Sequence, residues 1–98
     1  MSLRDYLEGV RECVLQGWTK DAYARDEHGD QCGILEARAV CFCLNGAMRR
    51  MGGNDDEYYK ACEVLGDAVS PAGISGFNDT HTKAEVIGML DRVIEVCP

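Results

Sequence analysis

Three polar residues near the carboxyl end of the sequence, Asn78, Asp79 and His81, are of types that can do chemistry. A carboxylate and an imidazole can transfer protons, and beside a thiol they could activate a nucleophile or hold a ligand. The six cysteines of the chain offer such a thiol, for example Cys32. However, the sequence has neither a glycine-framed nucleophile nor a phosphate-binding loop. We therefore expect no enzymatic activity and assign no catalytic residue.

Metal coordination is the second chemistry that these residue types allow. Cys41 and Cys43 lie close together in the sequence, but on a helix side chains two apart point in directions about 200° apart and cannot share an ion. His28, Cys32 and His81 are the remaining candidates for a zinc site. They lack the matched, closely spaced cysteine pairs that known zinc sites use. The sequence predicts no metal site and no cofactor.

An architectural role explains the region around Asn78 more simply. Phe77 can anchor the core, while Asn78 or Asp79 accepts hydrogen bonds from loop amides. The functional alternative is a small polar surface in which this region lies beside two aromatic residues from earlier in the chain. The candidate binding residues are Trp18, Tyr23, Asn78, Asp79 and His81.

Four helical segments are predicted to position these residues. The first has an apolar stripe, is capped by Ser2 and ends at Gly17. The last begins at a capping box formed by Thr82 and Glu85, after a loop over residues 70–79. The predicted helices cover residues 3–16, 35–51, 55–69 and 83 onward.

The segment between residues 18 and 33 shows no helical period. Trp18 and Tyr23 could anchor it against the core. A short hairpin is one possibility, with residues 23–25 facing residues 30–32, and an ordered loop is the other.

The predicted fold class is all-α. Residues 1–98 are expected to form a single globular domain with four compactly packed helices and an irregular or short β-hairpin insert between the first two. In the second helix, the small residues Gly46 and Ala47 would let a neighbouring backbone approach closely. Asn54 is the expected cap of the third helix.

The composition limits the classes of partner. The formal net charge is −7, so we expect no direct nucleic-acid binding, because such binding requires Lys and Arg to neutralise phosphates. The amino terminus lacks a signal-peptide pattern, and no apolar run reaches the roughly eighteen residues of a membrane span. We expect a cytoplasmic protein without membrane contact whose six cysteines are reduced thiols, whereas secretion would allow disulfides. The oligomeric state stays open.

Several short motifs together resemble a known family. They are Gly17-Trp18, residues 23–25, residues 43–47, Phe77-Asn78-Asp79, and Thr82-x-x-Glu85-Val86. In this order they are similar to small bacterial and phage proteins that share a domain of unknown function. The resemblance implies a compact, mostly helical domain of phage or mobile-element origin. It implies no activity, substrate or catalytic residue.

The expected function is a small acidic cytoplasmic protein-interaction module, encoded by a phage and acting on a host protein. Its contacts would be the acidic surface and the insert that carries Trp18 and Tyr23. The alternative is a small enzyme or ligand-binding domain that uses Asp79, His81 and a nearby thiol. A deep pocket holding these three groups would favour the alternative, and an exposed apolar patch would favour the interaction module.

Overall fold

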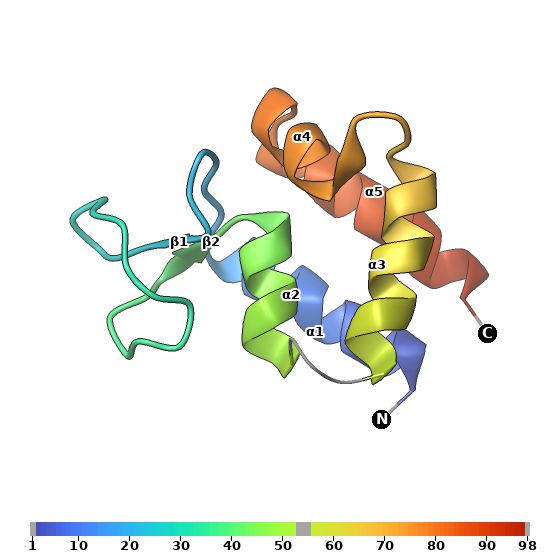
Figure 1. Ribbon diagram of the computed structural model, residues 1–98, viewed down its shortest axis with the longest axis horizontal. Coiled ribbons are helices and arrows are strands. Elements are labelled where there is room, and N and C mark those ends of the chain that lie inside the picture. Colours follow the sequence, from blue (N-terminus) through green and yellow to red (C-terminus); the bar gives the residue numbers. More distant parts are fainter. Residues whose placement is uncertain (1, 53–55, 98) are drawn as a thin grey trace.

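The computed structural model describes residues 2–52 and 56–97, which form five helices and two short strands. Figure 1 shows the helices gathered into one body, from which the strands and their connecting segments project at one end. The elements are α1 Leu3–Gln16, β1 Ala24–Arg25, β2 Cys41–Phe42, α2 Leu44–Gly52, α3 Asp56–Ala68, α4 Gly73–Thr80 and α5 Lys83–Val96.

Helix α1 confirms the prediction for residues 3–16 and lies against α2, α3 and α5. The Ser2 hydroxyl accepts a hydrogen bond from the Asp5 amide at 3.1 Å, and the Gly17 amide donates to the Cys13 carbonyl at the other end. These bonds satisfy helix-terminal groups that would otherwise lack partners. The stripe that α1 buries in the core consists of Tyr6, Leu7, Val10 and Val14.

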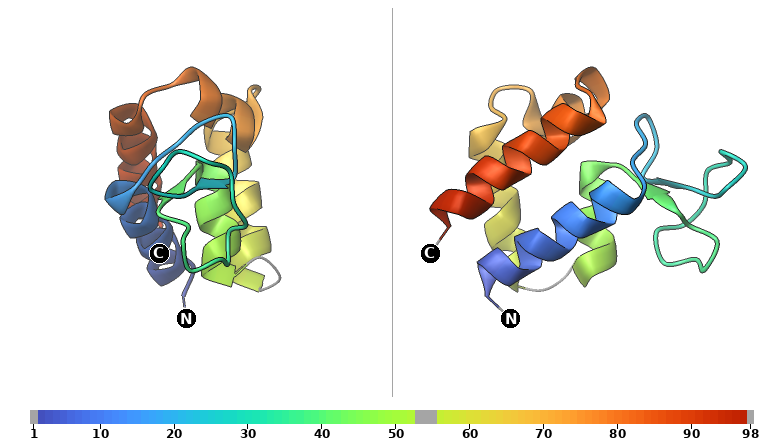
Figure 2. Two further views of the ribbon diagram at one scale, coloured as in Figure 1. Left: turned by 90° about the vertical axis from the view of Figure 1, so that its left-hand side faces the viewer. Right: turned by 180° about the vertical axis from the view of Figure 1, so that it is seen from behind.

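Residues 18–43 form the projecting part of the molecule, which Figure 2 shows beyond one end of α1. Strand β1 pairs with β2 in antiparallel orientation, with Ala24 opposite Phe42 and Arg25 opposite Cys41. The predicted hairpin between residues 23–25 and 30–32 is present only as a single antiparallel bridge from Arg25 to Gln31. The main partner of β1 therefore lies farther along the chain than the sequence indicated.

The predicted helix over residues 35–51 is wrong in its first half, because α2 begins only at Leu44. The uncharged run before Leu44 is equally compatible with a buried strand and a buried helix. Its backbone bonds go to the insert: the Val40 amide donates to Arg25 O at 3.0 Å, and the Cys43 amide donates to Tyr23 O at 3.2 Å. Tertiary pairing thus decides the conformation.

The predicted loop over residues 70–79 is also wrong, because Gly73–Thr80 form helix α4. The described residues therefore contain five helices rather than four. The predicted mostly helical fold with a small insert between the first two helices is confirmed, and the insert contributes a two-stranded sheet. Two glycines lower the helix propensity of this segment. Packing overrides propensity here, since Ile74 and Phe77 lie against the core and Asn78 is fully buried.

The last two predicted helices agree more closely with the structure. Helix α3 covers Asp56–Ala68, and its predicted cap Asn54 and first residue Asp55 lie outside the described residues. The capping box of α5 is confirmed, since Thr82 Oγ1 accepts from the Glu85 amide at 3.2 Å and Glu85 Oε1 accepts from the Thr82 amide at 2.9 Å.

One apolar core joins the helices to the base of the insert. It contains the buried stripe of α1, Phe42 of β2, Leu65 of α3 and Leu90 of α5. Within the described ranges, each helix is too short or too polar to reach across a lipid bilayer.

Candidate functional site

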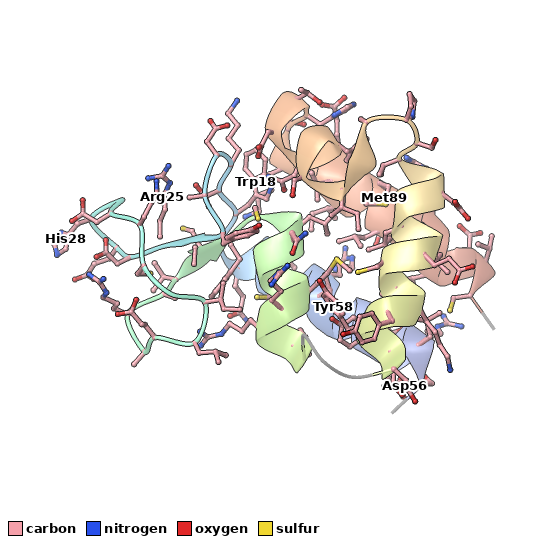
Figure 3. The ribbon with its side chains drawn as sticks, viewed as in Figure 1. Trp18, Arg25, His28, Asp56, Tyr58 and Met89 are labelled. Carbon is pink, nitrogen blue, oxygen red and sulfur yellow. The ribbon has the colours of Figure 1, made fainter. Side chains whose placement is uncertain are left out.

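The side chain of Asn78 is the polar centre of the fold. It lies on α4, is 0% exposed, and its Oδ1 accepts hydrogen bonds from Trp18 Nε1 at 2.7 Å and from the Leu44 amide at 3.0 Å. Its Nδ2 donates to the Thr19 carbonyl at 3.1 Å. Figure 3 shows Trp18 where the insert meets α4. Asn78 therefore ties three separate parts of the chain together.

These bonds also complete the start of α2. The first amides of a helix have no partner within the helix and need one from outside. Asn78 supplies an acceptor to the Leu44 amide, and Cys43 Sγ accepts from the Gly46 amide at 3.2 Å. The thiol of Cys43 thus occupies the place that Ser, Thr, Asn or Asp usually takes at a helix start.

Asp79 follows Asn78 and binds the insert at a second point, the backbone of Asp21. Its Oδ1 accepts hydrogen bonds from the Asp21 amide at 3.0 Å and from Asn78 Nδ2 at 3.1 Å. The backbone of Asp21 has φ 63°, a left-handed conformation that Asp adopts more readily than most residues. The bond from its amide to Asp79 compensates for the strain of this conformation.

A cleft of about 340 Å3 lies beside Asp79, between the insert and α4. Tyr23, on its rim, is 53% exposed, whereas Cys43 is 4% exposed. The backbone of Tyr23 lies close to α2: a Cβ atom on Gly46 would be 2.0 Å from the Tyr23 carbonyl oxygen, which accepts from the Cys43 amide at 3.2 Å. This confirms that Gly46 lets a neighbouring backbone approach. The cleft is lined by residues 21–23, Gln31, Cys43, Ser75 and Asp79.

The thiol of Cys43 is poorly suited to nucleophilic chemistry. Burial raises the pKa of Cys43, and the nearby carboxylate of Asp79 raises it further. The amides of Gly46 and Asn45 lower this pKa but are outweighed. Because the thiolate is the reactive form, a raised pKa keeps Cys43 in its unreactive state near neutral pH.

His81 lies apart from the cleft. It closes the C-terminal end of α4, where its ring stacks on Phe77 with the centroids 3.9 Å apart. His81 Nδ1 is 2.8 Å from the Phe77 carbonyl, which can only accept, so Nδ1 donates the bond. The ring lines a second hollow of about 400 Å3 together with Glu85 and Arg92. A capping role accounts for its position.

The predicted binding residues are thus divided by the structure. Trp18 is half-buried beside the fully buried Asn78, Tyr23 and Asp79 share the cleft, and His81 belongs to another surface. Cys43 was not among the predicted site residues. Cys43 directly precedes the first residue of α2, which is where a capping side chain is expected. Because the second helix was predicted to begin at residue 35, Cys43 was placed inside that helix and was not recognised as a cap. Over residues 2–52 and 56–97, no group of His, Cys, Asp or Glu side chains could hold a metal ion.

Comparison with known proteins places the chain in a family. The family model described as "Family of unknown function (DUF6197)" matches residues 1–96. The chain belongs to this family. The expected resemblance to an uncharacterised family is therefore confirmed, although the family description gives no activity. No curated protein and no solved structure matches the chain.

Proposed function

We propose that this protein is a small acidic protein-interaction module whose contact surface is centred on the cleft between the insert and α4. The observation that carries the proposal is the exposed Tyr23 ring at the rim of a cleft that contains Asp79. Energetically dominant residues of protein interfaces are often aromatic and lie beside pockets that a partner fills. In the wider proposal, the protein is phage-encoded and acts in the cytoplasm on a host protein.

Rigid support of the cleft favours a binding role. The buried Asn78 holds α4 against the insert, and the close contact between Gly46 and the Tyr23 carbonyl fixes the rim. A surface that is already in its binding geometry loses less conformational entropy when a partner docks. The net charge of −7 would speed encounter with a basic partner surface.

The experiment is affinity capture with the immobilised protein, followed by measurement of the affinity of the purified partner. We expect Tyr23→Ala to weaken binding at least about tenfold, as loss of a central aromatic contact does. The matched control is Tyr59→Ala, because Tyr59 is 60% exposed on α3 and does not line the cleft. Equal binding by wild type and Tyr23→Ala would refute the cleft as the contact surface, as would the absence of any partner above background.

A second candidate is a small enzyme or ligand-binding domain that uses Asp79, His81 and a thiol. It is favoured by the presence of Cys43 and Asp79 in one cleft. The raised pKa of Cys43 and the separate position of His81 count against the enzyme. The alkylation rate of Cys43 separates this candidate from the interaction module.

A further inference from the structure

The carboxylate of Asp79 is held in one orientation. Two donors from different parts of the chain, the Asp21 amide and Asn78 Nδ2, both bind Oδ1. Within the described part of the chain, neither a hydrogen bond nor an ion pair engages Oδ2. An oriented carboxylate oxygen beside a cleft is prepared to accept a hydrogen bond from a bound group, and such bonds are strongest with a charged donor.

The cleft has room for one long side chain, and its lining suits an apolar stem with a polar end. Its volume of about 340 Å3 is at the lower end of ligand sites, which run from about 300 to 1,000 Å3. The apolar stem of a bound side chain can contact Ala22, the Tyr23 ring and the Cys43 thiol. Asp79 lines the same cleft and can bind the polar end of that side chain. Lysine and arginine combine such a stem with a charged end group.

The charges near the cleft also favour a cation. Asp21 and Asp79 both line it, and none of the described residues that line it is basic. Arg49 is a nearby positive charge, with its Cζ atom 5.5 Å from the centroid of the Tyr23 ring and its Nε bonded to Asn45 Oδ1. One guanidinium that already has these partners does not neutralise two carboxylates.

We propose that the cleft receives a cationic side chain of the partner protein, lysine or arginine, with its charged end hydrogen-bonded to Asp79 Oδ2 and its stem against Tyr23. This inference rests on the proposed function, because it names the chemistry of the partner at the same cleft. The chain would recognise a basic segment of its partner through one anchoring residue.

The test is an NMR titration of the full chain with Nα-acetyl-lysine amide and Nα-acetyl-arginine amide. We expect saturable shifts of the amides of residues 21–23, Ser75 and Asp79, with a Kd of about 1 mM for one of the two probes. The same lysine probe acetylated at Nζ, which removes the charge, should bind at least about tenfold more weakly. This comparison uses the wild-type chain and needs no variant to fold.

Asp79→Asn is the matching variant, because the amide oxygen can still accept the two bonds now made to Oδ1. It should weaken binding of the better probe at least about fivefold. Asp67→Asn is the control, since it changes the net charge equally but lies on α3, away from the cleft. Equal weakening by both variants would show general attraction to an acidic surface and overturn the proposal. So would equal binding of the charged and uncharged probes, or no shifts at the cleft.

The outcomes also separate this inference from the proposed function. If Tyr23→Ala abolishes partner capture while neither charged probe binds, the interaction surface stands and the ligand class is wrong. If a charged probe binds through Asp79 while capture is insensitive to Tyr23→Ala, the cation site stands and the proposed contact surface is wrong.

Discussion

The indole of Trp18 and the amide of Asn78 are joined by a 2.7 Å hydrogen bond that connects the start of the insert to helix α4. The same Asn78 oxygen accepts from the Leu44 amide, so one atom positions both the insert and α2. The cleft beside Asp79 depends on this pair, because its walls are the segments that Asn78 connects.

Replacement of Asn78 tests this dependence. Asn78→Ala leaves the Leu44 amide and the Thr19 carbonyl without their partner and should lower the free energy of unfolding by about 2–4 kcal/mol. Urea unfolding followed by the fluorescence of Trp18, the single tryptophan, measures the loss. Asn45→Ala is the control, because the side-chain oxygen of Asn45 accepts an exposed hydrogen bond from Arg49 on the same helix. A change below about 0.5 kcal/mol for Asn78→Ala would show that the amide is dispensable.

Two glycine replacements should have opposite effects. Gly46→Ala places a methyl group 2.0 Å from the Tyr23 carbonyl oxygen, so the insert must move away from α2. We expect a loss of about 1–3 kcal/mol, although alanine is the better helix former. Gly66→Ala in α3 meets no atom within 4 Å and should gain about 0.5–1 kcal/mol. Thermal unfolding of both variants measures the difference, and a stabilised Gly46→Ala protein would contradict the close contact.

The sequence predictions were correct where local interactions determine the structure and wrong where contacts between distant residues determine it. Helices α1 and α5 were predictable because their caps, Ser2 and Thr82, and their apolar stripes are local features. The start of α2 and the existence of α4 were not, because they depend on bonds to distant residues such as Tyr23 and Trp18. The hypothesis that Tyr23 and Asp79 share a surface agrees with the cleft, but the contribution of Gln31, Cys43 and Ser75 depends on contacts between distant segments and was not predicted.

The capping box of α5 should make stability depend on pH. The amide of Thr82 lowers the pKa of Glu85 from its ordinary value of 4.5. A lowered pKa in the folded state gives stability that is present above the unfolded pKa and is lost as pH falls through the folded value. Glu85→Gln keeps the cap but cannot titrate, so it should lose less stability than wild type between about pH 6 and about pH 3. Melting temperatures across this range test the difference, and identical curves would rule out a contribution from Glu85.

Alkylation of the thiols distinguishes the two candidate functions. Because burial raises the pKa of Cys43, iodoacetamide at neutral pH should modify it at least about tenfold more slowly than the half-buried Cys32. Mass spectrometry after short exposures gives the rate at each cysteine, and unfolding in urea should make the two rates similar. If Cys43 reacts before Cys32 in the folded protein, its thiol is reactive. That result would support the enzyme candidate over the interaction module.

The tie between Trp18 and Asn78 has a consequence for the protein during its synthesis. Contacts between residues far apart in the chain form only after both partners are available, and they are slow to form. A nascent chain that has emerged as far as α3 already contains the insert but has neither Asn78 nor Asp79 to hold it. Such a chain presents no cleft to a partner. If the proposed contact surface is correct, a chain can bind its partner only after residues 78 and 79 have emerged from the ribosome and paired with the insert.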